Sequence, residues 1–337
     1  MTVRGRLGAM LPWGVALVTM LLAILAALGT GRFPVGLGDL LALVTGHGDA
    51  LPDAARTVLW NLRLPRILSA VLVGASLAAA GAAFQAMFRN PLASPDLLGV
   101  SAGASLGAVL GIVLDLPVAG VQLLAFGGGL AAVGGVLGLS GLAGRRGEDP
   151  MLVLILAGIA LGALLGAGIS MLKVFADPYS QLPAMTFWLL GSLAGATQGD
   201  ILAAALAAVP WLVVLFLLRW RLNLLTLGED EARALGVPTA RLRLAAIVAA
   251  TFATAACTAL AGSVGWVGLV VPHAARMLGG ADLRRVLPLS MLLGAAFLLG
   301  VDTVARSAAK VEIPLGVLTA VLGTPLFLWL LARRRTP

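Results

Sequence analysis

Few side chains in this 337-residue sequence are of the types that perform covalent chemistry, and those few are scattered. The two histidines, His47 and His273, lie far apart, and no H-E-x-x-H pair or Cys/His cluster accompanies them. Cys257 is the only cysteine, and no G-x-S-x-G segment supplies a nucleophile. Neither of the two lysines, Lys173 and Lys310, follows a glycine, so the phosphate-binding G-x-x-x-x-G-K-[ST] pattern is missing. The sequence therefore predicts no catalytic residue, no metal site and no ATP site in this chain.

The remaining candidates for specific recognition are charged groups beside apolar runs. Asp302 is the only carboxylate near the interior of such a run, and Arg306 lies one helical turn further on, where the two can pair. Arg63 and Arg66 are three residues apart, so both guanidinium groups share one face at a helix start. There they can bind carboxylates in a fixed geometry, or reach the membrane interface as anchors. Ion-coupled transporters usually carry ionisable groups inside their spans, and the expected spans of this chain hold almost none. If the chain transports a substrate, the energy must therefore come from another subunit.

The composition identifies the environment that positions these groups. Sixty per cent of the residues are apolar, 11% are charged and the mean hydropathy is +1.03, whereas a soluble domain has about 25% charged residues. The sequence predicts an all-α polytopic membrane protein of about ten spans, the first of them a span and not a cleaved signal sequence. The expected spans are 12–31, 64–86, 93–114, 117–140, 151–172, 196–218, 244–263, 265–278, 286–304 and 314–332.

The distribution of basic residues predicts the orientation. With these spans, sixteen Lys and Arg residues fall on the side of the N-terminus and seven on the opposite side. The positive-inside rule then places both termini in the cytoplasm. The net charge of +8 is accounted for by this asymmetry. Because the basic residues form no continuous stripe, nucleic acid is not an expected partner.

The loop near 219–243 is the only sizeable one on the predicted cytoplasmic side. Its acidic run from Glu229 to Glu231 suits a helix start. Gly236 can adopt the left-handed backbone conformation that is common just after the end of a helix, and Pro238 prevents that helix from continuing. Thr239 is expected to be the N-cap of the next helix. A compact capped element of this kind favours a docking surface for a soluble partner over a solvated connector.

Glycines at four-residue spacing predict close helix packing. One series is Gly99, Gly103, Gly107 and Gly111, and the other is Gly158, Gly162 and Gly166. Each series leaves a smooth groove along one helix face, where a neighbouring backbone can approach.

Six segments in order along the chain resemble the FecCD-type permeases, the membrane subunits of bacterial ABC importers for ferric siderophores, haem and cobalamin. They are 63–107, 187–196 (FWLLGSLAGA), 227–236 (LGEDEARALG), 262–276 (GSVGWVGLVVPHAAR), 282–306 and 312–329 (EIPLGVLTAVLGTPLFLW). The resemblance implies that residues 1–337 form a single transmembrane domain in the bacterial cytoplasmic (inner) membrane.

The resemblance also implies partners and site residues. The expected partners are a second copy of the chain, two cytosolic ABC ATPases and a periplasmic or lipid-anchored substrate-binding protein. The ATPases would bind ATP and Mg, and the chain itself would hold no permanent cofactor. The implied sites are ATPase coupling by Gly228, Glu229, Glu231, Ala232, Leu235 and Gly236, a cytoplasmic constriction at Asn90, Pro91 and Leu92, and binding-protein docking by Arg63, Arg66 and Arg306.

The resulting expectation is a permease subunit that moves an iron chelate, a ferric siderophore or haem, into the cytoplasm by alternating access. Cobalamin and, more remotely, molybdate are alternative cargoes, and a heterodimer with a paralogue is an alternative assembly. An ion-coupled secondary transporter and a membrane scaffold are the alternative classes.

Overall fold

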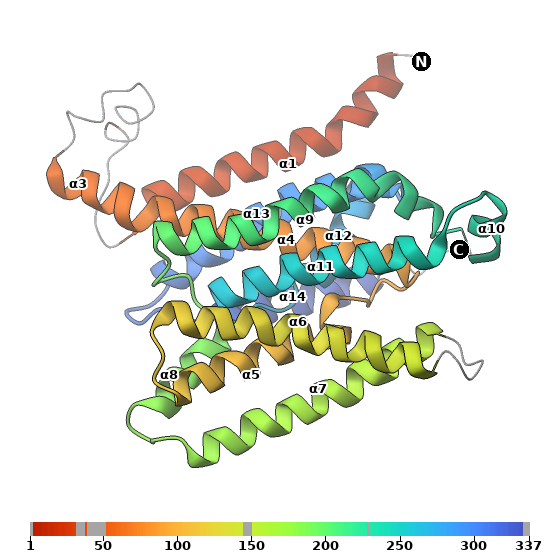
Figure 1. Ribbon diagram of the computed structural model, residues 1–337. Coiled ribbons are helices and arrows are strands. Elements are labelled where there is room, and N and C mark those ends of the chain that lie inside the picture. Colours follow the sequence, from red (N-terminus) through yellow and green to blue (C-terminus); the bar gives the residue numbers. More distant parts are fainter. Residues whose placement is uncertain (1–2, 32–37, 39–51, 144–149, 228, 333–337) are drawn as a thin grey trace.

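The computed structural model describes residues 3–31, 38, 52–143, 150–227 and 229–332, and every regular element in these ranges is a helix (Figure 1). The predicted all-α class is therefore confirmed. The long helices are α1 (Val3–Gly29), α4 (Leu64–Met87), α6 (Val118–Ala143), α7 (Pro150–Phe175), α9 (Gln198–Leu224), α11 (Thr239–Ala261), α13 (Leu283–Ser307) and α14 (Leu315–Ala332). The shorter elements are α3 (Asp53–Thr57), the π-helix η2 (Val58–Arg63), the 3-10 helix η3 (Pro95–Leu98), α5 (Val100–Val113), α8 (Gln181–Leu190), α10 (Glu229–Ala234) and α12 (Val267–Gly279).

Each of the ten predicted spans falls on one of these helices. In the described part of the chain, seven helices are long and apolar enough to cross a membrane, while α5, α12 and α14 are shorter apolar helices. In the span expected near 93–114, the α-helix begins only at Val100. The preceding residues form a turn and the 3-10 helix η3, and Gly99, between η3 and α5, has φ +77°. Helix α8 was not predicted. The number of ten spans and their orientation stay predictions.

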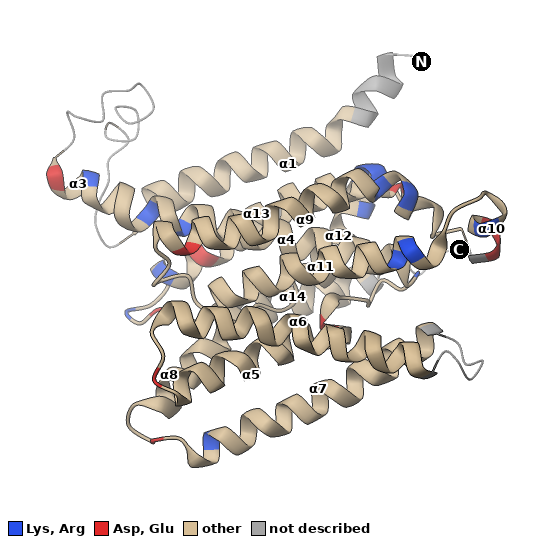
Figure 2. Ribbon diagram, in the orientation of Figure 1, with Lys and Arg blue, Asp and Glu red and all other residues tan. Residues whose placement is uncertain are grey.

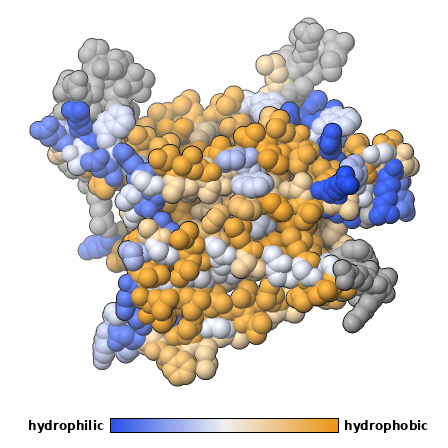
Figure 3. Space-filling model, viewed as in Figure 1, coloured by the Kyte–Doolittle hydropathy of each residue, from blue (hydrophilic) through white to orange (hydrophobic). Residues whose placement is uncertain are grey.

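The surface of the bundle has two polar ends separated by an apolar belt. Figure 2 shows the charged residues gathered at the two ends, and Figure 3 shows apolar side chains covering most of the middle. Helix α7 illustrates the belt, since Leu156 and Leu164 on it are 56% and 68% exposed. A bilayer is the environment that covers such a surface favourably. In Figure 1 the start of α1 and helix α10 lie at one end of the bundle, and α3 and α8 lie at the other.

Helix α4 forms the centre of the bundle, and its small residues explain how it fits there. It packs against α13, α11, α12 and α9, and most of its residues are buried. A methyl group added at Gly74 would overlap the carbonyl oxygen of Gly294 on α13, and one at Gly81 would overlap that of Gly268 on α12. The helix backbones therefore touch directly, as small residues permit in membrane bundles.

The two predicted glycine series differ in the structure. Gly103 and Gly107 on α5 lie against the backbone of α6, and Gly111 lies against Val121 of the same helix, so the predicted close approach is confirmed for these three. Gly99, which precedes α5, instead faces α7 at ordinary contact distances. In the second series, Gly158 lies against the backbone of Leu97. At Gly162 and Gly166, an added Cβ would have no described atom of another element within 4 Å, so both glycines face open space.

Candidate functional site

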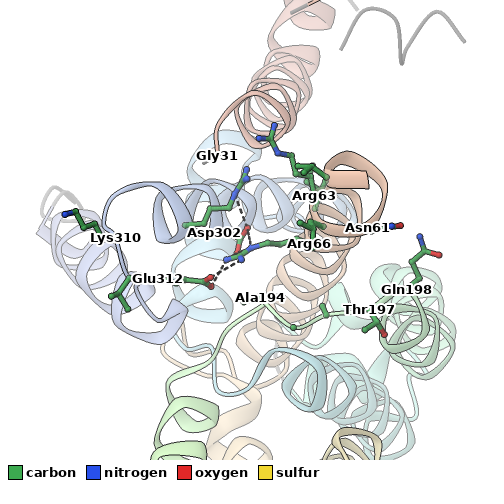
Figure 4. Close-up of a pocket in the computed structure, with 17 residues that line it drawn as sticks. Gly31, Asn61, Arg63, Arg66, Ala194, Thr197, Gln198, Asp302, Lys310 and Glu312 are labelled. Atoms are coloured by element: carbon green, nitrogen blue, oxygen red, sulfur yellow. Dashed lines mark hydrogen bonds and ion pairs between the residues drawn. The ribbon is translucent and has the colours of Figure 1, made fainter. Parts of the chain in front are cut away.

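A pocket of about 910 Å³ that contains several charged side chains opens at the end of the bundle opposite α10, and Figure 4 shows it in close-up. Its walls come from the junction of η2 and α4, from the end of α13, from the segment 308–314 and from the segment 191–197. The pocket brings together all three predicted docking arginines. Its charged lining residues are Arg63, Arg66, Asp302, Arg306, Lys310 and Glu312.

The guanidinium group of Arg66 binds two carboxylates at once. Its Nε lies 2.8 and 2.9 Å from the two Oδ atoms of Asp302, its Nη1 lies 3.0 Å from Oε2 of Glu312, and its Nη2 lies 2.6 Å from Oε1. Nη2 also lies 2.8 Å from Oδ1 of Asp302. All three nitrogens are therefore engaged, and both edges of the planar group are occupied in the bidentate manner that makes Arg–carboxylate pairs strong.

The predicted ion pair between Asp302 and Arg306 is present, but it is the longer of the two ion pairs that Asp302 makes. The Nε of Arg306 is 3.9 Å from Oδ2 of Asp302, so the main partner of Asp302 is Arg66 and not its neighbour one turn away. Arg66 reaches Asp302 because α4 and α13 touch at Gly74 and Gly294. The two residues are 236 positions apart, and no local pattern indicates that contact.

Arg63 and Arg306 both bind the end of α1, a contact that the sequence did not indicate. Nη1 of Arg63 donates to the carbonyl oxygen of Leu28, and Nη2 of Arg306 donates to that of Ala27. These carbonyls belong to the last turn of α1, where they have no N–H partner within the helix and where positive charge is favourable. The two arginines thus hold the end of α1 against the pocket while they line it.

Glu312 is a site residue that the sequence analysis did not single out. Its Oε1 accepts a hydrogen bond from Oγ of Ser192 at 3.0 Å in addition to the bonds from Arg66. Burial acts to raise the pKa of Glu312, but the bonds from Arg66 outweigh burial and the pKa lies below its ordinary value. The available signal was its place in the segment EIPLG, as an acidic residue directly before the last apolar run.

The coupling segment at the opposite end is a short helix followed by a left-handed turn. Gly236 has φ +78°, and its N–H donates to the carbonyl of Arg233 at 2.8 Å, while the N–H of Val237 donates to that of Ala232 at 3.0 Å. This is the helix end predicted from Gly236. The predicted cap at Thr239 is wrong, because Pro238 holds the cap position and the Thr239 hydroxyl accepts from Nε of Arg233 at 3.4 Å.

The six predicted coupling residues divide into inner and outer ones. Ala232 is fully buried, whereas Glu231 is exposed and Leu235 is 62% exposed. Glu229 begins α10, and Gly228 lies outside the described residues. Helix α10 projects from the end of the bundle (Figure 1), so its outer residues present a small surface.

The three predicted constriction residues form the turn that follows α4. The N–H of Leu92 donates to Oδ1 of Asn90 at 2.9 Å, and the N–H of Ala93 donates to the Asn90 carbonyl at 3.1 Å. Pro91 is half-buried and Leu92 is 51% exposed. Since α4 begins at the arginine pocket and ends just before this turn, the length of the whole helix separates the two predicted sites.

A second polar cluster, also missed by the sequence analysis, joins α4 to α12. Gln85 is 4% exposed, and its Nε2 donates to the carbonyls of Gly268 and Leu269 at 3.2 Å each. Its Oε1 accepts from Nη2 of Arg276. Pro272 lacks the N–H that would otherwise serve the Gly268 carbonyl, so the amide of Gln85 replaces the missing donor.

Known proteins resemble this chain in sequence and in overall fold. The model of the FecCD transport family matches residues 19–333. The molybdate import system permease protein MolB of Haemophilus influenzae is 38% identical over 319 residues, 92% of each chain. A probable iron chelatin transport system permease protein of Helicobacter pylori is 40% identical over 289 residues, 86% of each chain. A solved structure described as an inward-facing metal-chelate type ABC transporter is 36% identical, with a TM-score of 0.85 over 96% of this chain and 98% of that one.

Proposed function

The chain belongs to the FecCD transport family, as a permease of an ABC importer of the metal-chelate type, and from this premise we propose that it moves an iron chelate into the cytoplasm. The cargo proposed is a ferric siderophore or haem. The observation that carries the proposal is the family match over residues 19–333, which includes both polar ends of the bundle. The chain performs no covalent chemistry on the cargo, and a partner subunit hydrolyses ATP.

The two ends of the bundle suit two different soluble partners. We propose that the α10 end faces the cytoplasm and contacts an ABC ATPase through the exposed Glu231 and Leu235, with Ala232 as the buried anchor. The arginine pocket then faces the periplasm or outer surface and receives carboxylates of a substrate-binding protein through Arg63, Arg66 and Arg306. Charge-assisted bonds to a guanidinium supply both steering and geometric specificity there.

The proposed assembly contains two copies of this chain in a bacterial cytoplasmic membrane. Helix α7 supports a further helical contact, because only 11% of its span is buried and Gly162 and Gly166 leave room for another backbone. With one ATPase on each copy, ATP binding would draw the two α10 segments together and rock the two bundles. The turn at Asn90, Pro91 and Leu92 would narrow the cytoplasmic end of the path between them.

Two alternatives are tested alongside the proposal. Relatives of similar identity are named for molybdate import and for cobalamin import, so molybdate and cobalamin are the competing cargoes. A proton-coupled mechanism would use Asp302, which instead is held by Arg66 at the end of α13. If the chain were instead an ion-coupled transporter, Asp302→Asn should abolish uptake even when a functional ATPase is present.

The experiment is reconstitution of the chain in proteoliposomes with its ATPase and the binding protein. ATP-dependent uptake is measured for a ferric siderophore, haem, cobalamin and molybdate, with an ATPase variant that cannot hydrolyse ATP as the control. Uptake of an iron chelate only in the presence of ATP and the binding protein is the expected result. Uptake of cobalamin or molybdate instead would refute the proposal that the cargo is an iron chelate. Uptake driven by a proton gradient without ATP would refute the proposal that the chain is part of an ATP-driven importer.

A further inference from the structure

The two carboxylates on Arg66 differ in how easily they can leave it. Asp302 belongs to the helix α13, and its side chain is 2% exposed. Glu312 belongs to the non-helical segment 308–314, and its side chain is 28% exposed. Breaking the inner pair would leave the buried Asp302 with only the 3.9 Å contact to Arg306, whereas water can solvate Glu312. Asp302 is therefore the fixed partner of Arg66, and Glu312 is the exchangeable one.

Arg66 cannot bind a further carboxylate in bidentate fashion without losing one that it already holds. Its Nε, Nη1 and Nη2 all lie within 3.0 Å of Asp302 or Glu312, so both edges of the guanidinium group are taken. Figure 4 shows Arg66 pointing between these two carboxylates at the pocket. A carboxylate that enters from solvent thus meets a site already occupied by a carboxylate of the chain itself.

Glu312 also links the start of α14 to the rest of the pocket. Ser192 donates to its carboxylate from the segment 191–197, and Arg66 holds it from α4. Three residues further on, the N–H of Leu315, the first residue of α14, donates to the carbonyl of Gly191 at 3.0 Å. The Arg66–Glu312 pair is therefore the bond that joins this arrangement to α4, and its loss would remove that link.

We infer that Glu312 occupies the place of the docking carboxylate: a carboxylate of the binding protein replaces Glu312 on Arg66, and the displaced Glu312 releases the start of α14. This inference rests on the proposed function of the pocket as the docking site. It adds to that function an internal competitor, which keeps α14 tied to α4 while no binding protein is present. Asp302 stays on Arg66 throughout and keeps the guanidinium oriented.

The first test compares the affinity of the binding protein for the purified permease–ATPase complex carrying Glu312 or Glu312→Gln. Removal of the competing carboxylate should tighten binding roughly fivefold, the size of one partly exposed ion pair. Asp177→Asn is the matched control, because Asp177 is an exposed carboxylate outside the pocket and its removal changes the net charge equally. We expect the control to bind like wild type.

The second test measures the release of α14 directly. In a Cys257→Ser background, spin labels at Asn61 beside Arg63 and at Val317 in the first turn of α14 report the distance between the pocket and the start of α14, and both positions are exposed. Addition of the binding protein to wild type should lengthen or broaden this distance. Glu312→Gln should show the same change without the binding protein, whereas Asp177→Asn should not.

Each result separates the inference from the function on which it rests. If Arg66→Lys weakens docking but Glu312→Gln binds like wild type or more weakly, the pocket is the docking site and the exchange is refuted. If Arg66→Lys and high salt leave docking unchanged, the docking site itself is wrong, and the exchange is refuted with it. An unchanged label distance in Glu312→Gln would overturn the release of α14.

Discussion

At the scale of single residues, some polar side chains inside this bundle bond to specific partners on another helix. Gln85 is the clearest example, because it supplies the carbonyl of Gly268 with a donor that Pro272 cannot provide. It also accepts from Arg276, so one buried amide serves both a backbone group and a charge. A buried polar network of this kind is stabilising only while all of its members are paired.

We predict that Gln85→Leu destabilises the protein by about 1–3 kcal/mol, since it leaves the Gly268 carbonyl and Arg276 without this partner in an apolar interior. The measurement is thermal or denaturant unfolding of the purified protein in detergent. Ser170→Ala is the control, because the Ser170 hydroxyl is exposed and bonds only to the carbonyl of Gly166 in its own helix. Equal stability of the two variants would contradict the role given to Gln85.

A second prediction concerns Glu312 and pH. Because the bonds from Arg66 hold the folded-state pKa of Glu312 below its ordinary value of roughly 4.3, the pair stabilises the fold above that pH. This contribution is lost as the pH falls through the lowered folded-state pKa. Wild type should therefore have a higher Tm than Glu312→Gln at pH 7, and the difference should shrink in strong acid. A difference that does not change with pH would show that the Glu312 charge is not responsible.

At the scale of elements, the turn between α10 and α11 decides where α10, the helix proposed to contact the ATPase, points. The left-handed Gly236 reverses the chain directly after α10, and the buried Ala232 fixes the inner face of that helix. An added Cβ at Gly236 would meet no atom within 4 Å, so the restriction at this position is the backbone conformation and not space. A side chain here therefore strains the turn without disturbing the bundle.

We predict that Gly236→Val costs about 1 kcal/mol or more in the turn, and that it weakens ATPase association while leaving membrane insertion intact. Gly280→Val is the matched control, because Gly280 has φ +83° and the same open surroundings but lies at the end of α12. The measurement is the fraction of ATPase that co-purifies with each variant. If both variants retain the same amount of ATPase, the turn has no special part in docking.

At the scale of the whole molecule, the two ends of the bundle differ in their charged residues. The end with α10 carries most of the arginines, and the other end carries the pocket in which arginines and carboxylates pair (Figure 2). The positive-inside rule assigns the first end to the cytoplasm, and both proposed docking sites depend on that assignment.

Single cysteines in a Cys257→Ser background test this orientation. Leu235→Cys, at a position that is 62% exposed, should react with a membrane-impermeant reagent only from the cytoplasmic side. Asp53→Cys, at the exposed start of α3, should react only from the outside. Labelling of position 235 from the outside would reverse the orientation and refute both docking assignments together.

The sequence by itself determined the membrane environment, the position of most helices and the turn at Gly236. These features depend on local properties: the transfer of a continuous apolar run into the bilayer, and the backbone freedom of one glycine. Local spacing put Arg63 and Arg66 on one helix face and indicated that α5 carries a groove, while the family resemblance implied the docking role of Arg63, Arg66 and Arg306.

Only the tertiary structure decided which groups meet. Asp302 pairs mainly with Arg66 across 236 residues and only at 3.9 Å with Arg306 one turn away, and Gln85 serves a carbonyl 183 residues away. Glu312 entered the site because the start of α14 lies beside α4 and Ser192. Such pairings follow from helix packing, here from direct backbone contact at Gly74 and Gly81. A local pattern fixes the face of a helix but not its neighbour, so the contacts that hold the pocket together became visible only in the folded molecule.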